Sequence, residues 1–280
     1  MCGIVGYIGR REAAPIIVEG LKKLEYRGYD SFGVATLGET INLVKHKGRI
    51  SEDADAVLRL KGKTGIGHTR WATHGVPNDA NAHPHTDCTG KIALVHNGII
   101  ENFTELKRQL LSRGHTFTSD TDTEVVVHLI EEAYGRRKDL LGAVQDVLPL
   151  LEGSYALLVI TSCEERLIAA RNASPLVIGV GDGENFAASD MTPILEHTER
   201  AIFLEDGDVA TISRGKVEIF HEGNPITRPV ELIDWSLEDV KKGGYPHFML
   251  KEIYEQPLAF YNTVHSVDME ELQKTLRNHQ

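Results

Sequence analysis

Cysteine is scarce in this 280-residue chain, which contains only Cys2, Cys88 and Cys163. The three are odd in number and widely spaced, and they form no CxxC pair. The sequence therefore indicates neither a disulfide framework nor a structural zinc knuckle. A reducing compartment fits this usage, and we expect a cytoplasmic protein.

Long apolar runs are also missing. An uninterrupted run such as 156–160 is far shorter than the ~20 residues that a membrane-spanning helix needs. The opening MCGIVGYIG is followed by Arg10, Arg11 and Glu12, which reverses the positive-then-apolar order of a signal peptide. We expect no membrane partner.

Positive charge is in deficit, with 30 Lys and Arg against 41 Asp and Glu and a net charge of −11. This balance argues against nucleic acid or an anionic membrane as the main partner. The length suffices for one large domain or two modest ones with a buried core. We therefore expect a globular protein with a small-molecule substrate.

Helical periodicity appears in four stretches: about 14–26, a stretch from Asn102 to just before Gly114, about 122–134 and about 140–151. Asn102 and Glu105 have the spacing of a capping box, in which each side chain bonds the other residue's backbone. Pro149 is expected to distort the last turn of the fourth helix.

Short apolar runs predict strands through much of the remaining sequence: CGIVGYI, FGVAT, INLVKH, TGIGHTR, KIALVH, SYALLVIT, RLIAAR, PLVIGVG, NFAAS, AIFLE, DVATIS and KVEIFH. Most of their connections are too short for parallel crossovers, so we expect antiparallel sheets and an α+β fold. From about Asp234 the pattern changes, and glycines and prolines surround the helical piece HFMLKEIYE. We expect a domain over 2–233 and a linker or docking tail over 234–280.

Cys2 is the first candidate for chemistry. If Met1 is removed, the thiol of Cys2 lies beside its own α-amino group, which titrates near ~7.7–8.0 and can accept the thiol proton. An amine-activated nucleophile of this kind performs acyl transfer, and Gly3 would leave room for a substrate carbonyl. The alternative is a small buried side chain at the start of a strand.

His96-Asn97-Gly98 offers two interpretations that are compatible with each other. An Asn-Gly pair between apolar runs is typical of a hairpin turn. The amide of Asn97 and the backbone N–H of Gly98 could also stabilise a developing oxyanion.

Two further motifs contain charged residues. Arg70, in HTRWATHG, could hold a carboxylate through two hydrogen bonds, although a loop arginine is usually a solvated surface charge. Asp122, in SDTDTEV, could bind an ammonium group, although acids and hydroxyls at this point are explained by capping of the helix N-terminus. Together the two residues would bind both charged ends of a free amino acid.

A rival hypothesis takes His74, His83, His85 and Cys88 as a non-catalytic metal-binding module. Their spacing matches no standard zinc pattern, so ordinary polar roles for these histidines are favoured. We expect no metal and no cofactor.

Six motifs of the chain, taken together and in order, resemble those of the class II glutamine amidotransferases. They are CGIVG, YRGYDSFG, GHTRWATHG, NAHPH, VHNGIIEN and SDTDTEV. The resemblance covers roughly residues 2 to 255. It implies the four-layer αββα sandwich of the N-terminal nucleophile hydrolases, with two antiparallel sheets between helices. Within the family, the branch that aminates a sugar phosphate has motifs similar to RGYDS, TRWATHG and HNGII of this chain. The purine-pathway branch is the alternative.

The resemblance also implies roles for individual residues. Cys2 is similar to the nucleophile that attacks glutamine, and Asn97 and Gly98 fall on the oxyanion positions. The remaining matches are Arg70 and Asp122 for the two charged ends of glutamine, Thr73, His74 and Gly98 for the pocket lining, Trp71 for the lid, Arg27 and Gly28 for the loop beside the nucleophile, and His83 for support of the glutamine loop.

The branch that aminates a sugar phosphate also needs a sugar-phosphate isomerase domain, which is expected in cis or in trans. Without it the chain is expected to hydrolyse L-glutamine but not to aminate a sugar. A homodimer is one expectation for the full-length protein. The sequence leaves open whether the chain is an excised domain.

Overall fold

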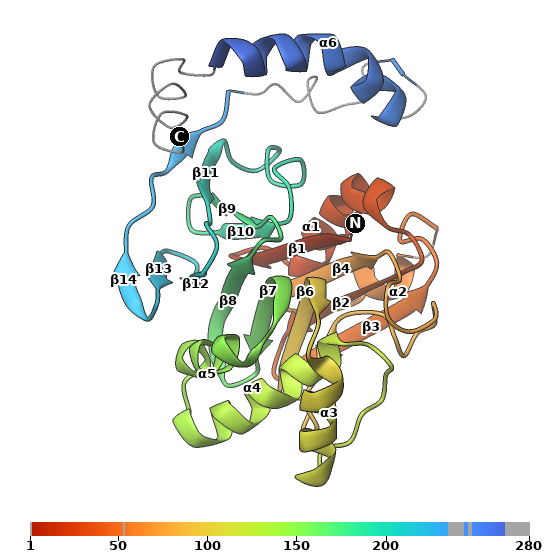
Figure 1. Cartoon of the computed structure of the whole chain (residues 1–280), viewed down its shortest axis with the longest axis vertical. Coiled ribbons are helices and arrows are strands. Elements are labelled where there is room, and N and C mark those ends of the chain that lie inside the picture. The colour runs from red at the N-terminus through yellow and green to blue at the C-terminus, as the bar shows by residue number, and fades with distance from the viewer. Residues whose placement is uncertain (1, 53, 235–243, 246–247, 267–280) are drawn as a thin grey trace, which may run out of the picture. The chain divides into compact units, whose positions relative to one another are not determined.

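The computed structural model describes residues 2–52, 54–234, 244–245 and 248–266. The chain divides into two compact units, Met1–Asp234 and Trp235–Gln280. The first unit contains two β-sheets and the helices that pack on them (Figure 1). Over the described ranges, no helix combines the length and the apolar character that crossing a bilayer requires.

The first sheet consists of β1 (Gly3–Ile8), β2 (Ser31–Leu37), β3 (Ile41–Lys47), β4 (Thr64–Arg70), β9 (Val177–Val180), β10 (Asn185–Ala188), β11 (Arg200–Phe203) and β15 (Glu231–Leu232). Its eight strands lie in the order β15-β11-β9-β10-β1-β4-β2-β3. Each neighbouring pair is antiparallel.

The second sheet consists of β5 (His85–Thr86), β6 (Ile92–Ile100), β7 (Gly153–Thr161), β8 (Glu164–Asn172), β12 (Asp208–Ile212), β13 (Val217–His221) and β14 (Asn224–Ile226). Its seven strands lie in the order β14-β13-β12-β8-β7-β6-β5, again with antiparallel neighbours. The predicted antiparallel pairing is therefore confirmed for the described strands.

The helices of the first unit are α1 (Ala13–Leu24), α2 (Asp55–Leu58), α3 (Phe103–Ser112), α4 (Thr123–Arg137) and α5 (Leu140–Val147). The four predicted helices correspond to α1, α3, α4 and α5. Two short 3₁₀ turns, Glu25–Arg27 and Leu148–Leu150, follow α1 and α5. The second turn contains Pro149, which explains why the α-helix ends at Val147.

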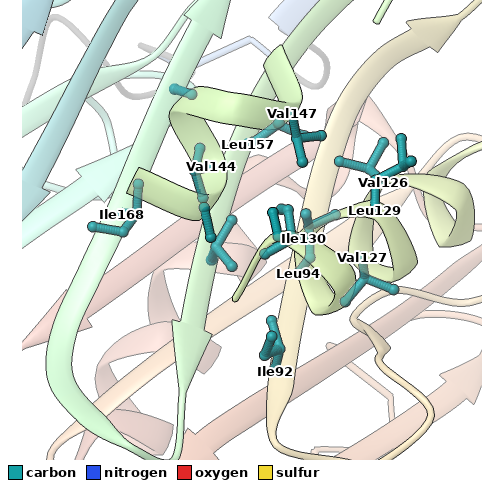
Figure 2. Close-up of a cluster of buried hydrophobic side chains, with 14 of the residues drawn as sticks. Ile92, Leu94, Val126, Val127, Leu129, Ile130, Val144, Val147, Leu157 and Ile168 are labelled. Carbon is teal, nitrogen blue, oxygen red and sulfur yellow. The ribbon is translucent and has the colours of Figure 1, made fainter. Parts of the chain in front are cut away.

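Alternation along β6 explains how the layers stack. Ile92 and Leu94 belong to a core cluster with α4 and α5, whereas Ala93 and Val95 belong to the cluster between the sheets. Successive residues of a strand point to opposite faces, so one strand supplies both cores. Figure 2 shows the first cluster, in which Ile130 of α4 lies against β6.

The outer face of the first sheet is covered by α1. Ile17 lies close to Gly67 of β4, where an added Cβ would come within 2.3 Å of the Ile17 side chain. The order of layers is thus α1, first sheet, second sheet, then α4 and α5. This arrangement confirms the predicted α+β class and the αββα sandwich.

The predicted capping box at Asn102 is wrong. The Asn102 side chain makes no bond to the start of α3; it donates to Leu150 O at 2.9 Å and accepts from Glu152 N at 3.2 Å. Glu105 instead pairs with Arg108 one turn along the helix. Asn102 therefore ties α3 to the segment that enters β7.

The second unit contains α6 (Phe248–Ser266), which includes the predicted helical piece HFMLKEIYE from Phe248 onward and has Pro257 in its interior. The other parts of the predicted tail, 235–243, 246–247 and 267–280, lie outside the described residues.

Candidate active site

Strand pairing gathers the sequence motifs at one end of the first sheet. Cys2 directly precedes β1, and the register places Gly3 opposite Thr69 on β4. The same strand pairs on its other side with β2, where Ser31 lies opposite Arg70. The start of β1, the start of β2 and the end of β4 therefore meet.

The Cys2 sulfur lies against the backbone of Trp71. The Trp71 N–H donates to Cys2 Sγ at 3.2 Å, and Sγ lies 3.5 Å from Trp71 O. Burial raises the pKa of the Cys2 thiol, although the Trp71 N–H and the charge of Arg70 act in the opposite direction. A nucleophilic Cys2 therefore needs a base to take its proton.

Asn97 reaches Cys2 from the second sheet. Its side-chain nitrogen donates to the Cys2 backbone carbonyl at 3.1 Å, and its Oδ1 lies 3.0 Å from His68 Nε2. Burial lowers the pKa of His68 to about 3, so the ring is neutral and donates through Nε2. This bond directs the NH₂ group of Asn97 toward Cys2.

The hairpin interpretation of Asn97-Gly98 is wrong, because both residues lie within β6. Gly98 pairs with Tyr155 of β7 and has φ +127. An added Cβ at Gly98 would lie 2.0 Å from Ser154 O. Glycine is needed here by a positive φ and by the approach of the neighbouring strand, not by a turn.

Arg70 is a buried cation, so its interpretation as a solvated surface charge is wrong. The side chain ends β4 with 3% of its surface exposed. Its guanidinium donates to His74 O and, at 3.2 Å, to Gly75 O. Nη1 is buried and has no hydrogen-bond partner among the described residues. Burial lowers the pKa of Arg70, and the charges of Cys2 and Asp122 oppose that shift.

Asp122 does not cap α4 with its side chain. Its Oδ2 accepts the Ile100 N–H of β6 at 2.8 Å, and the residue is 4% exposed. The carboxylate is thus held beside the strand that carries Asn97. The capping interpretation of Asp122 is wrong.

The loop after β4 carries Trp71, Thr73 and His74. The Trp71 ring is half exposed and lies edge-on to Tyr29 at 6.2 Å, and the His74 ring lies 5.1 Å from Phe103. Thr73 is exposed.

The loop is held by Asp30, a residue that the sequence analysis did not single out. Its Oδ2 accepts the Ala72 N–H at 2.8 Å, and its own N–H donates to Arg70 O at 2.9 Å.

Arg27 and Gly28 form the neighbouring wall. Arg27 pairs with Asp190, which follows β10 by two residues. An added Cβ at Gly28 would lie 2.6 Å from Trp71 N, so glycine allows the two loops to touch. The structure therefore brings Arg27 and Gly28 next to the Cys2–Trp71 contact.

His83 belongs to a cluster of buried histidines. Its ring centroid lies 4.3 Å from that of His68 and 4.9 Å from that of His85, and its Nδ1 lies 3.4 Å from His96 N. Burial lowers the pKa of all four histidines. His68 and His96 were missed as site residues; the polar position of His68 in the apolar strand TGIGHTR was the available signal.

The metal-binding module proposed from the sequence is not assembled. His83 and His85 lie in the buried cluster, and His74 packs on Phe103. The Cys88 sulfur lies 3.5 Å from His115 Nδ1 instead.

Comparisons with known proteins decide the family. A family of glutamine amidotransferase domains matches residues 68–196. Glutamine–fructose-6-phosphate aminotransferase (isomerizing) of Thermococcus kodakarensis is 55% identical over 271 residues, which are 95% of this chain and 45% of that protein. The enzyme of the same name from Thermus thermophilus is 54% identical over 268 residues, covering 94% of this chain and 44% of its own length. The chain belongs to the class II glutamine amidotransferases.

Solved structures agree with this family. The glutamine phosphoribosylpyrophosphate amidotransferase of B. subtilis, in complex with ADP and GMP, aligns with a TM-score of 0.69 at 29% identity, over 79% of this chain and 49% of that one. The amidotransferase chain spans about half the length of the curated relatives it matches.

Proposed function

We propose that this chain hydrolyses L-glutamine to glutamate and ammonia, as the glutaminase half of a glucosamine-6-phosphate synthase, with Cys2 as nucleophile. The observation that carries the proposal is the donation by the Asn97 amide to Cys2, at the sheet end where buried Arg70 lies. The identity of 55% to an aminotransferase of fructose 6-phosphate supports this branch over the purine-pathway one.

The chemistry requires removal of Met1, which lies outside the described residues. The freed α-amine of Cys2 takes the thiol proton, because burial of the thiol leaves it protonated at neutral pH. Sulfur attacks the side-chain amide carbon of glutamine. The protonated amine then gives its proton to the departing nitrogen, so ammonia leaves and a thioester remains. Water adds to the thioester carbon and gives a proton to the α-amine. The carbon–sulfur bond then breaks, the amine returns that proton to the sulfur, and glutamate is released.

The tetrahedral intermediate carries its negative charge on the former amide oxygen. The Asn97 side-chain NH₂ and the Gly98 backbone N–H are proposed to donate to that oxygen. Asn97 is oriented before substrate arrives, because His68 holds its Oδ1. Fixed donors of this kind stabilise the transition state without reorganisation during the reaction.

Glutamine is proposed to bind through its charged ends. The free Nη1 donors of Arg70 would bind the α-carboxylate, and Asp122 would bind the α-ammonium group. Thr73, His74 and Gly98 would line the same pocket.

Closure of the site is proposed to involve the walls around Cys2. The half-exposed Trp71 would act as a lid that retains ammonia. Arg27 and Gly28 would support this lid from the neighbouring loop. His83 would support the loop that holds glutamine.

The remaining proposals concern the whole protein. Residues 2–233 would be the glutaminase domain, and 234–280 would lead toward a sugar-phosphate isomerase domain, in cis or in trans. Ammonia would then be delivered to fructose 6-phosphate. The protein would be cytoplasmic, and the full-length protein would form a homodimer.

The experiment that tests the function measures glutamate release from L-glutamine by Met1-processed protein and its Cys2→Ala variant. We expect activity in the parent and none in Cys2→Ala. The control is Cys163→Ala, which removes an exposed thiol in the turn between β7 and β8 and should retain full activity. An active Cys2→Ala variant would contradict the proposal.

A further inference from the structure

Four ligand-type side chains converge away from Cys2: Cys88, His115, His128 and Glu131. Cys88 lies between β5 and β6, His115 lies between α3 and α4, and the other two lie on α4. One ligand atom from each residue lies within 4.8 Å of the other three. Three separate segments therefore direct sulfur, nitrogen and oxygen atoms toward one point.

Four of the six distances between these atoms match those of a tetrahedral metal centre, and all six are within 4.8 Å. Cys88 Sγ lies 3.5 Å from His115 Nδ1 and 3.5 Å from His128 Nδ1. Glu131 Oε2 lies 3.2 Å from His115 Nδ1 and 3.1 Å from His128 Nδ1. Zinc–ligand bonds of about 2.0–2.3 Å at tetrahedral angles put neighbouring ligand atoms roughly 3.3–3.6 Å apart. The four distances agree with this geometry to within a few tenths of an ångström.

An outer carboxylate lies near each of the two histidines and is hydrogen-bonded to one of them, His115. His115 uses Nδ1 toward the cluster, while its Nε2 lies 3.2 Å from Glu132 Oε1. His128 also directs Nδ1 toward the cluster, and its buried Nε2 lies 3.8 Å from Glu124 Oε1, which is too far for a hydrogen bond. Metal-bound histidines commonly donate their other ring N–H to a carboxylate, which fixes the ring and the tautomer.

The outer carboxylates are themselves held in place. Glu132 pairs with Arg113 at 3.1 Å. Glu124 accepts from the backbone N–H groups of Thr118 and Ser119 at 2.8 and 2.7 Å. The inner atoms are thus positioned by the surrounding structure, as a binding site requires.

A hydrogen-bond network without metal is the alternative arrangement. In that case Glu131 Oε2 would accept from three donors at once: both Nδ1 atoms and the Cys88 backbone N–H at 3.1 Å. The Cys88 sulfur would hydrogen-bond to both imidazole rings at 3.5 Å. A divalent cation would replace the two Nδ1–H donors that crowd Glu131 Oε2, and thiolate and carboxylate together would supply two negative charges to balance it.

We propose that Cys88, His115, His128 and Glu131 bind one Zn²⁺ ion in a structural site. All four positions of the tetrahedron come from the protein, as in structural rather than catalytic zinc sites. The ion would join the β5–β6 connection to α4, which begins directly after Asp122. The proposal concerns stability of this region and does not depend on the proposed reaction.

The test measures zinc in the 280-residue chain without an affinity tag, after zinc loading and gel filtration. We expect about one zinc per chain in the parent and less than about a tenth in Cys88→Ser. Cys163→Ser and Cys2→Ser are the matched thiol controls, and both should retain the metal. Cys88 and Cys163 are both exposed, so neither serine is expected to disturb folding.

Two carboxylates that are adjacent in sequence provide a graded test. Glu131→Gln removes a direct ligand and should abolish stoichiometric binding, whereas Glu132→Gln removes an outer partner and should weaken affinity about 10–100-fold. Co²⁺ loading should give thiolate charge-transfer absorption in the parent and in Cys163→Ser but not in Cys88→Ser.

Chelation distinguishes a structural role from surface binding. We expect a chelator to lower the Tm of the parent and to leave the Tm of Cys88→Ser unchanged. A parent that holds no stoichiometric zinc would overturn the proposal, and so would a Cys88→Ser variant that binds zinc as tightly as the parent.

Discussion

The side-chain amide of Asn97 donates to the backbone carbonyl of Cys2 at 3.1 Å, although the two residues are 95 positions apart in sequence. Cys2 precedes a strand of one sheet, and Asn97 lies within a strand of the other. Packing of the two sheets is therefore what brings the proposed nucleophile and the proposed oxyanion donor together.

Asn97→Ala should lower kcat by ~10²-fold or more with little change in KM, because the lost donor acts mainly in the transition state. Steady-state glutaminase kinetics measure this. Asn172→Ala is the control, since Asn172 also donates its amide to a backbone carbonyl, that of Gly153 at 2.9 Å. A loss below a few-fold in Asn97→Ala would remove the residue from the mechanism.

Arg70→Lys should raise KM for glutamine more than it lowers kcat. Lysine keeps the charge but lacks the planar fork that binds a carboxylate through two hydrogen bonds, and the α-carboxylate is remote from the reacting amide. Arg166→Lys, at a partly exposed position on β8, should leave both constants unchanged. An unaltered KM in Arg70→Lys would exclude Arg70 from substrate binding.

Gly98→Ala should destabilise the protein by at least about 2 kcal/mol, because alanine is strained at this positive φ and its Cβ would meet a backbone oxygen. Gly135 is the matched control, since an added Cβ meets nothing within 4 Å in α4. Gly135→Ala should stabilise by about 0.5–1 kcal/mol. Urea unfolding measures both; equal effects at the two positions would contradict the strain argument.

The buried histidines predict a pH-dependent stability. Burial lowers the pKa of His68 to about 3 and those of His83 and His85 well below the usual value. Below pH ~6.5 the unfolded chain binds protons that the folded chain does not, so stability falls as pH falls.

The expected slope is about 1.4 kcal/mol per pH unit for each such histidine. The free energy of unfolding, measured between pH 7.5 and 5, should decline steadily below 6.5, before most carboxylates titrate. His68→Gln should reduce this slope by about 1.4 kcal/mol per pH unit, which is the contribution of one histidine. A flat profile over this range would show that the cluster is hydrated in solution.

Much of the fold follows from local sequence patterns. The short apolar run KIALVH predicts a strand, and the periodicity of Val126, Leu129, Ile130 and Ala133 predicts α4. Such patterns depend on neighbouring residues, so they can be read without knowing the tertiary structure.

The errors concern residues whose partners are distant in sequence. Asn102 resembles a cap but bonds the segment before β7, and Asp122 resembles a cap but bonds Ile100. Gly98 resembles a turn residue but lies in a paired strand. In each case a tertiary contact replaced the local bond that the sequence suggested.

The Cys88 cluster was missed for the same reason. Its ligands are 27 and 40 residues apart, and no short motif joins them. The local signal was limited to His128 and Glu131, which share one face of α4 at an i,i+3 spacing. Only the packing of the β5–β6 connection against α4 shows that Cys88 belongs with them.

The most direct measurement is mass-spectrometric mapping of the chain after reaction with an electrophilic glutamine analogue. Our account predicts a single adduct on an N-terminal Cys2, prevented by excess L-glutamine and absent from Cys88 and Cys163. A chain that retains Met1 yet turns over glutamine at full rate, or a substrate-protected adduct on another cysteine, would contradict it.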